Sequence, residues 1–353
     1  MRQESECEPM KSKILITGGA GYIGSHTCIE LLAAGFELVV IDNLSNSKRE
    51  SLRRVEIISG AKLIFVESDL RNKSAIEQIF AAHSIDAVIH FAGLKAVGKS
   101  VEKPLQYYDV NVTGSLVLFD AMAAANVKTV VFSSSATVYG DPHAVPIRED
   151  FPLSATNPYG RSKLMIEDIL RDVYRADPSW RIGLLRYFNP VGAHVSGMIG
   201  EDPNGIPNNL MPIVAQVASG KRDVVSVYGN DYNTQDGTGV RDYIHVMDLA
   251  RGHVKALNAL NTLSSSQNRS GLMTLNLGTG TGYSVLDVVK AFEAASGRAV
   301  PHKIAARRPG DVAKCFADPA LAAKTIGWRA ELGLDEMCAD AWRWQSANPN
   351  GFT

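Results

Sequence analysis

Cysteine is scarce in this 353-residue chain, and its four copies are scattered at positions 7, 28, 315 and 338. No two of them form a CxxC pair, so neither a disulfide framework nor a zinc site is indicated, and we expect no metal. No apolar run reaches the roughly 18 residues that a membrane-spanning helix needs. The first ten residues are polar and acidic, unlike a signal peptide. Together these absences favour a cytoplasmic protein that does not enter a membrane.

An excess of charge of either sign is also missing. Lysine and arginine number 36 and aspartate and glutamate 37, which gives a net charge of -1. A chain so close to neutral gives no electrostatic reason to expect nucleic acid or an anionic membrane as a partner. Hydrophobic residues make up 45% and charged residues 21%, as in ordinary globular proteins. The length suggests two cores, or one large core with an insertion.

The first half of the chain alternates short apolar runs with helical patterns. The strands that we expect are 13–17, 37–42, 62–66, 86–91, 128–133 and 181–187, with a helix over about 22–34 after the first. Continuous apolar strands separated by helices are typical of a parallel sheet covered on both faces. Right-handed crossovers then give an α/β, doubly wound Rossmann sheet.

The pattern changes after Asn189, where proline and glycine become dense through position 212 and the alternation is lost. We expect a loose tail over 1–10, a Rossmann domain over 11–188, and a smaller mixed α/β substrate lobe over most of 189–353. Some later segments would return to the Rossmann domain. Residues 261–271 have the composition of a surface loop.

A glycine-rich turn follows the first expected strand directly. Gly18, Gly21 and Gly24 have the spacing GxxGxxG between a strand and a helix, which favours close approach of a dinucleotide pyrophosphate to the helix N-terminus. The second strand ends on Asp42, whose carboxylate would accept hydrogen bonds from both ribose hydroxyls and repel a 2′-phosphate. No arginine follows it directly, so we predict NAD rather than NADP. The alternative is a glycine turn without a ligand.

Two further strand ends face the same cofactor. Asp69 and Leu70 follow the third strand and are placed to meet the adenine. The segment 91–95 leaves the fourth strand toward the phosphates and the nicotinamide ribose, since ligands of such sheets bind outside the carboxyl ends of the strands. Asp69 could equally be a helix N-cap.

Tyr159 and Lys163 lie four residues apart, one turn from each other, after the helix-start signal Thr156-Asn157-Pro158. A free tyrosine titrates near ~10, and lowering its pKa to ~7 takes roughly 4 kcal/mol. One ammonium at ~5 Å supplies on the order of 3 kcal/mol at an effective dielectric of ~20. An oxidised nicotinamide could supply the rest. Taken alone, YxxxK is more often an ordinary exposed helix pair.

The fifth expected strand ends in three serines, and Ser135 is the third. A hydroxyl delivered to the carboxyl edge of the sheet can hydrogen-bond a sugar or alcohol oxygen. Serine runs also occur as plain turn chemistry. Combined with the glycine turn, Tyr159 and Lys163, they favour a catalytic site.

These segments together resemble the extended short-chain dehydrogenases/reductases and, within them, the UDP-glucose 4-epimerase (UDP-galactose 4-epimerase) family. The resemblance covers about 13–351, and the segments that carry it are 18–26 (GGAGYIGSH), 90–98 (HFAGLKAVG), 132–140 (FSSSATVYG), 185–193 (LRYFNPVGA), 207–212 (PNNLMP) and 236–245 (DGTGVRDYIH).

The resemblance implies a role for each matching position. Tyr159 would be the catalytic base for the 4-hydroxyl of a hexose, Lys163 would keep it ionised, and Ser135 would hydrogen-bond the same oxygen. The cofactor NAD would meet Gly18, Gly21, Tyr22, Ile23, Gly24, Asp42, Asn43, Asp69, Leu70, Phe91, Ala92, Gly93, Lys95, Tyr159, Lys163 and Phe188. The UDP-hexose substrate would meet Ser135, Tyr159, Asn189, Asn209, Leu210, Tyr228, Arg241, Arg308, Asp311 and Cys315.

The implied reaction inverts C4 through a 4-keto sugar, with hydride lent to tightly held NAD and returned to the other face. The chain would thereby interconvert UDP-glucose and UDP-galactose. In the family, the position of Cys315 borders the sugar pocket and some members carry tyrosine, so the smaller cysteine would admit a 2-acetamido group. A cysteine that only packs is the alternative. The expected helices 104–125 and 158–174 pair across a two-fold axis in related proteins, which implies a homodimer.

Two other readings compete. A sugar-nucleotide 4,6-dehydratase shares the fold, the tyrosine and the lysine, but it needs an acid/base pair directly after the serine, and here Ala136 and Thr137 occupy those positions. A non-catalytic dinucleotide sensor need not keep Tyr159 and Lys163 in register.

Overall fold

The computed structural model describes residues 12–205, 207–262, 270–308 and 310–353. The expected N-terminal tail and most of the expected 261–271 loop lie outside these residues. Among the described helices, none is both long enough and apolar enough to cross a membrane.

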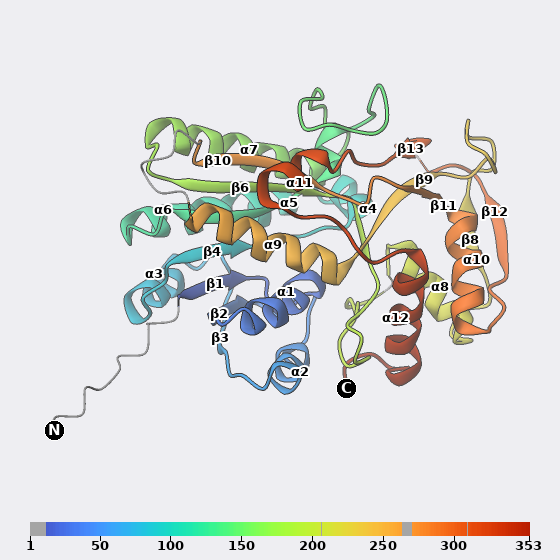
Figure 1. The fold of residues 1–353 in the computed structure, drawn as a ribbon, viewed down its shortest axis with the longest axis horizontal. Helices are drawn as coiled ribbons and strands as arrows, with labels where there is room; N and C mark the ends of the chain where they lie inside the picture. The colour runs from blue at the N-terminus through green and yellow to red at the C-terminus, as the bar shows by residue number, and fades with distance from the viewer. Residues whose placement is uncertain (1–11, 206, 263–269, 309) are drawn as a thin grey trace.

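A seven-stranded sheet forms the centre of the molecule (Figure 1). Its order is β10-β6-β5-β4-β1-β2-β3, and every neighbouring pair is parallel. The strands are β1 (Lys13–Thr17), β2 (Glu37–Asp42), β3 (Ile64–Glu67), β4 (Ala87–His90), β5 (Thr129–Ser135), β6 (Arg181–Tyr187) and β10 (Leu272–Leu277). The order reverses at β1 and β4, so the carboxyl ends of these strands flank the crevice where dinucleotides bind in doubly wound folds. The expected Rossmann fold is confirmed.

Helices cover both faces of the sheet because alternate strand residues point to opposite sides. Ile14 and Ile16 of β1 pack with α1, α2 and α9, whereas Leu15 packs with α3, α6 and α7. The bounds are α1 (Tyr22–Ala33), α2 (Arg49–Ser59), α3 (Lys73–Ala82), α6 (Gly114–Ala124), α7 (Pro158–Ala176) and α9 (Val246–Asn261). The continuous apolar strands of the sequence are therefore buried on two sides, as a parallel sheet requires.

The chain after Asn189 builds a smaller lobe beside the carboxyl edge of the sheet, to the right in Figure 1. Its core joins α8 (Leu210–Ala218), α10 (Val285–Ser296) and α12 (Leu334–Ala347). Its strands are β7 (Asn189–Val191), β8 (Val225–Tyr228), β9 (Val240–His245), β11 (Gly282–Ser284), β12 (His302–Ala305) and β13 (Lys314–Cys315), and α11 (Ala320–Ile326) lies near β10. Strand β9 pairs with β7, β11 and β13, and β8 pairs with β12. Helix α9 and strand β10 also follow Asn189, yet they pack on the large sheet.

The expected helix over 104–125 is interrupted. It runs as α5 (Pro104–Tyr107), a π-helical segment η1 (Tyr108–Thr113) and α6, after the short α4 (Val97–Glu102). The wider turn in η1 aims Asn111 inward, and Asn111 is 2% exposed. Such π-turns inside helices often mark functional positions.

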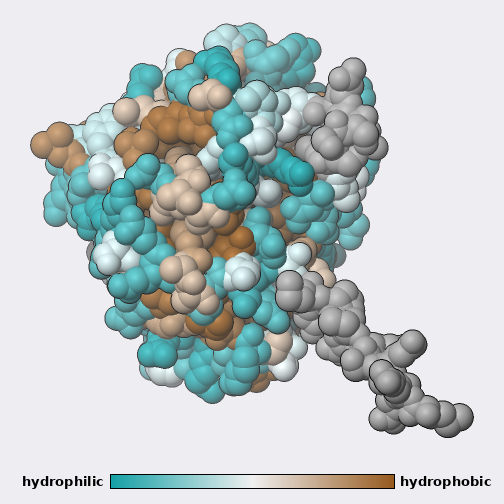
Figure 2. All heavy atoms as spheres, turned by 90° about the vertical axis from the view of Figure 1, so that its left-hand side faces the viewer, coloured by the Kyte–Doolittle hydropathy of each residue, from teal (hydrophilic) through white to brown (hydrophobic). Residues whose placement is uncertain are grey.

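Hydrophobic residues also reach the surface. Figure 2 shows one face, on which apolar side chains form a broken band between hydrophilic ones. Among the described residues, large exposed apolar side chains gather on α4 to α7: Val97, Val101, Leu105, Leu116 and Met165.

Candidate active site

The glycine turn between β1 and α1 is closely packed against the end of β4. A Cβ on Gly18, which has a φ of 71°, would lie 2.7 Å from the amide nitrogen of Ala92, and one on Gly24 would lie 2.4 Å from the Gly18 carbonyl oxygen. Gly21 is the N-cap of α1 and has no side chain to cap the helix. The first amide groups of α1 are therefore available to an anion, as a bound pyrophosphate requires.

Asp42 ends β2 beside this turn. Its Oδ2 accepts a hydrogen bond from the Ala20 amide at 3.1 Å, and its Oδ1 accepts from the Leu44 amide and the Ser47 hydroxyl, each at 2.9 Å. These bonds fix the carboxylate next to the glycine turn, where the ribose of a dinucleotide on α1 would lie. The residues present fit a dinucleotide, and the negative charge disfavours a 2′-phosphate.

Asp69 lies beside Asn43, whose amide donates to its Oδ2 at 2.8 Å. The guanidinium of Arg71 pairs with the same carboxylate at 2.8 Å and holds its pKa well below the usual range. The alternative of Asp69 as the cap of the following helix is wrong, because Asn72 caps α3 through the Ala75 amide. Leu70 packs close to Gly114 at the start of α6.

The segment after β4 is positioned by Asn111. The Asn111 side chain accepts a hydrogen bond from the Leu94 amide at 2.7 Å and donates to the Leu94 carbonyl at 3.1 Å and to the Ser162 hydroxyl at 2.9 Å. Phe91 stacks near His253 of α9, with ring centroids 4.8 Å apart. A Cβ on Gly93 would lie 3.1 Å from Asn111 Oδ1. Asn111 thus ties this expected cofactor segment to α7.

The serine end of β5 and the start of α7 meet at the same edge. Asn157 caps α7 by accepting from the Gly160 amide at 2.9 Å, with Pro158 as the first helical residue, so the helix-start prediction is confirmed. The Tyr159 side chain lies close enough to the Ser135 hydroxyl for Ser135 to influence its pKa. Ser135 also accepts from the Thr137 hydroxyl at 3.0 Å. The tyrosine and the serine that the sequence singled out are therefore neighbours.

The pKa values of Tyr159 and Lys163 differ from the expectation that a nearby ammonium lowers the pKa of the tyrosine. Burial raises the pKa of Tyr159 to about 12, and the nearby Ser135 hydroxyl only partly opposes that rise. Burial also lowers the pKa of Lys163 to about 7. In the protein without ligand, desolvation therefore favours the neutral forms of both the phenol and the amine.

Lys163 is 4% exposed and extends toward the sheet. Its ammonium donates to the Ser133 carbonyl at 2.7 Å and lies 4.9 Å from the centre of the Phe132 ring. The lysine is thereby fixed under the end of β5, one helical turn from Tyr159.

A second group of expected residues gathers in the smaller lobe. Arg241 and Arg308 share the carboxylate of Asp311, at 3.8 and 3.0 Å. The Arg308 guanidinium lies over the Tyr228 ring, 4.8 Å from its centre. An arginine pair beside an aromatic ring can hold a diphosphate and a flat base, because guanidinium binds phosphate oxygens bidentately.

The remaining expected substrate residues lie on β7, at the start of α8 and on β13. Cys315 in β13 pairs with Arg241 in β9 and packs near the buried Phe188. Burial raises the pKa of the Cys315 thiol to about 11, so the thiol is neutral. Asn189 begins β7, and Asn209 and Leu210 start α8.

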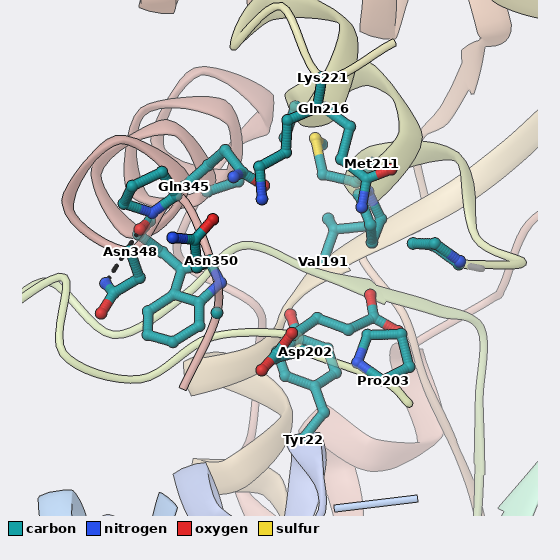
Figure 3. Close-up of a pocket in the computed structure, with 18 of the residues that line it drawn as sticks. Tyr22, Val191, Asp202, Pro203, Met211, Gln216, Lys221, Gln345, Asn348 and Asn350 are labelled. Carbon is teal, nitrogen blue, oxygen red and sulfur yellow. Dashed lines mark hydrogen bonds between the residues drawn. The ribbon is translucent and has the colours of Figure 1, made fainter. Parts of the chain in front are cut away.

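Glu201 connects the cofactor half to the substrate lobe. One of its oxygens accepts from both Lys95 and Asn209, each at 2.8 Å. It lines a pocket between α1, α8 and α12, in which Tyr22 of α1 lies opposite Met211 and Gln216 of α8 (Figure 3). Neither Ser135 nor Tyr159 lines that pocket.

Sequence reasoning missed three buried polar residues: Asn111, Glu167 and Arg186. The spacing of Tyr159, Lys163 and Glu167 at positions i, i+4 and i+8 is a signal for Glu167, because it places all three on one helix face. Asn111 and Arg186 leave no comparable local signal. Among the described residues, no group of three histidine, cysteine or acidic side chains is placed to hold a metal ion.

Known proteins match nearly the whole chain. A family model described as GDP-mannose 4,6 dehydratase matches residues 15–341. The chain is 64% identical to UDP-glucose 4-epimerase of Bacillus subtilis, over 96% of this chain and 98% of that protein. It is 57% identical to UDP-glucose 4-epimerase of Homo sapiens, over 97% of this chain and 99% of that protein.

Solved structures agree. UDP-glucose 4-epimerase from Bifidobacterium longum, in complex with NAD+ and UDP, is similar with a TM-score of 0.92 at 55% identity, covering 97% of this chain and 100% of that one. The enzyme from Stenotrophomonas maltophila, with bound NAD, has a TM-score of 0.92 at 49% identity, covering 96% and 99%. This chain belongs to the UDP-glucose 4-epimerase family of extended short-chain dehydrogenases/reductases.

Proposed function

We propose that this chain interconverts UDP-glucose and UDP-galactose by inverting C4, with tightly bound NAD. The observation that carries the proposal is that α7 brings Tyr159 and Lys163 to the serine end of β5, where Lys163 bonds the Ser133 carbonyl, in a chain so similar to known epimerases. Lys163 stands one turn away from Tyr159, and the glycine turn lies at the same edge of the sheet.

In this proposal Tyr159 accepts the proton of the 4-hydroxyl, and Ser135 hydrogen-bonds the same oxygen. NAD, when bound, supplies the acceptor for the C4 hydride and its donor for the return. The O4 proton and the C4 hydride leave one face and arrive at the other, so a 4-keto sugar forms and is consumed with no net redox change. Tyr159 returns its proton at the end.

The residue pattern explains how the sugar can turn between the two steps. Arg241 and Arg308 lie in the smaller lobe, away from Tyr159 along the chain, and carry the charge that a diphosphate needs. We propose that they hold UDP while few contacts hold the hexose. A tight hold at one end and a loose one at the other permit rotation about the phosphate linkage.

A direct experiment tests the activity. Purified protein is incubated with UDP-galactose and no added cofactor, and UDP-glucose is measured. We expect UDP-glucose to form, since NAD would be carried through purification. A protein confirmed to contain NAD that forms no UDP-glucose would overturn the proposal and favour the sensor.

The dehydratase alternative lacks its catalysts. Elimination of the 6-hydroxyl needs an acid and a base next to the reacting carbons. Ala136 is buried and apolar, and the Thr137 hydroxyl is engaged with Ser135 at 3.0 Å. Mass spectrometry of the product separates the two reactions, because elimination loses a water and epimerisation does not.

We also propose that UDP-N-acetylglucosamine is a substrate. Cys315 stands next to Arg241 in the sheet and packs against the cluster that contains Phe188, which supports a place for its small side chain beside the sugar. Cys315→Tyr should abolish turnover of the acetamido sugar while UDP-galactose turnover stays within about threefold. Equal losses for both substrates, or no acetamido turnover by the unmodified protein, would contradict this assignment.

A homodimer is the third proposal, and the apolar surface of α4 to α7 supports it. Val101 is 63% and Leu105 81% exposed, which is costly for a monomer in water. Leu105→Glu should shift the protein from dimer toward monomer in light scattering, whereas Leu321→Glu should not, because Leu321 is an exposed apolar residue on α11, which packs near α9 on the other face of the sheet. A monomeric unmodified protein would end this proposal.

A further inference from the structure

Five buried polar side chains connect the catalytic helix to three strands of the sheet. Ser134, Arg186 and Asn276 occupy one row across β5, β6 and β10, because Ser134 pairs with Arg186 and Arg186 with Asn276 in the strand register. Glu167 of α7 and Tyr139 complete the set. Each of the five is at most 1% exposed.

The hydrogen bonds within this set are specific. Arg186 donates to both oxygens of Glu167, at 2.9 and 2.6 Å, and the Ser134 hydroxyl donates to Glu167 at 2.5 Å. The third nitrogen of Arg186 donates to the Tyr139 hydroxyl at 3.0 Å, and Tyr139 donates to Asn276 at 2.7 Å. The planar guanidinium fork thus meets α7 on one side and the sheet end on the other.

A gain in stability is not a sufficient reason for burying the ion pair of Glu167 and Arg186. Removing two charges from water is costly, and a well-packed apolar pair of the same volume is often as stable or more so. What such a pair can add is a single geometry, since a bidentate fork fits only one orientation of the carboxylate. An apolar contact would allow α7 to slide or rotate, and one residue of slide is about 1.5 Å.

The position of Glu167 shows that the fixed geometry of the ion pair would control how α7 sits against β5. Glu167 lies one turn after Lys163 and two turns after Tyr159, and Ser134 directly precedes Ser135. The Glu167 carboxylate therefore contacts β5, which carries Ser135, and belongs to α7, which carries Tyr159. A misplacement of about 1 Å can cost about 100-fold in rate.

We propose that Glu167 and Arg186 are positioning residues for the epimerase reaction, which hold α7 in register so that Tyr159 and Lys163 meet Ser135. The inference rests on the proposed roles of Tyr159 and Lys163. It adds two residues that bond neither catalytic hydroxyl and that act on turnover rather than on binding.

The test separates position from stability with a charge-free pair. The double variant Glu167→Gln with Arg186→Met removes both charges and keeps an acceptor for Ser134. We expect a thermal midpoint close to that of the unmodified protein, retained NAD, a KM within about threefold, and a kcat lower by about 10- to 100-fold. The pH profile of kcat should also shift, because the surroundings of Tyr159 change. A stable double variant with full kcat and an unchanged pH profile would overturn the proposal.

Two single variants complete the experiment. Arg171 pairs with the same carboxylate from the solvent side at 2.7 Å, so Arg171→Gln is the matched control and should keep kcat within about twofold. A loss as large as that of the double variant would show that the charge balance of Glu167 matters rather than register, and would overturn the proposal. Ser134→Ala keeps the test possible where the double variant does not fold. We expect kcat to fall by about three- to tenfold and KM to stay unchanged. Full kcat in this variant counts against the proposal. Should Tyr159→Phe remain fully active, the proposed catalytic roles fail instead, which is a distinguishable result.

Discussion

The two halves of the candidate active site are built in different ways. On the sheet side, Ser135 and Lys163 are buried, and the chain fixes them through backbone contacts such as the bond from Lys163 to the Ser133 carbonyl. In the smaller lobe, Arg308 is 54% exposed and its partners are side chains, Asp311 and the Tyr228 ring. Buried groups held by backbone change little on binding, whereas exposed ion pairs exchange partners at low cost.

This difference assigns different tasks to the two halves. A hydride and a proton must move over short, fixed distances, which suits a pre-organised site. In the proposed reaction, a diphosphate would have to displace the carboxylate of Asp311 from Arg241 and Arg308, which suits a solvated site. Changes on the sheet side should therefore lower kcat, and changes in the lobe should raise KM.

The largest effect is expected at Tyr159. Tyr159→Phe removes the proton acceptor and should lower kcat by about 10³-fold while NAD remains bound, since general acid–base catalysis contributes about 10²- to 10⁴-fold. Tyr174→Phe, on the same helix with its hydroxyl bonded to the Gly271 amide at 3.0 Å, is the control and should keep full activity. The conversion of UDP-galactose is the measurement. Substantial turnover by Tyr159→Phe would contradict the assignment of proton transfer to the sheet side of the site.

Lys163→Met tests the buried charge. The folded-state pKa of Lys163 is about 7, below the ordinary value, so burial of the ammonium opposes folding. Without ligand, Lys163→Met should therefore unfold at a higher urea concentration, with a gain of about 2 kcal/mol, although kcat falls. The gain should be complete below pH 7 and shrink as the pH rises toward about 10.5, where the unfolded lysine also loses its proton. A stability gain of Lys163→Met that increases with pH would contradict the expected pH dependence.

Arg308→Met tests the grip on UDP. The loss of a charge-assisted bond of about 1.5 to 3 kcal/mol should raise KM for UDP-galactose by about 10- to 100-fold and leave kcat within about threefold. Its neighbour Arg307 pairs with Asp231 at 2.7 Å and stacks on Tyr232, so Arg307→Met is a matched control with little expected change. A fall in kcat alone for Arg308→Met would contradict the assignment of UDP binding to the smaller lobe.

Asp42→Asn has the smallest expected effect and sharpens the choice of cofactor. It keeps the size of the side chain and removes the charge that repels a 2′-phosphate, so NAD should bind about tenfold more weakly and NADP more tightly. Asp86→Asn, at the amino end of β4, is the control because the Asp86 side chain bonds only the Lys13 amide among the described hydrogen bonds. Titration of cofactor-free protein measures both affinities. An unchanged preference would remove Asp42 from the discriminating role.

The sequence by itself determined the elements whose cause is local. The turn at Gly18, the cap at Asn157 and the helical spacing of Tyr159 and Lys163 depend on residues a few positions apart, so they can be predicted without the fold. The strands of the first half were predicted for the same reason, since buried parallel strands show as apolar runs.

Only the tertiary structure decided the contacts between distant segments. Strand β10 joins the sheet after a stretch that lacks the earlier alternation, and it brings Asn276 beside Arg186. Glu201 meets Lys95 and Asn209 across the junction of the two halves, and Asn111 reaches the start of α7. These bonds join side chains from different elements, and the sequence records which groups can pair but not which ones the packing brings together.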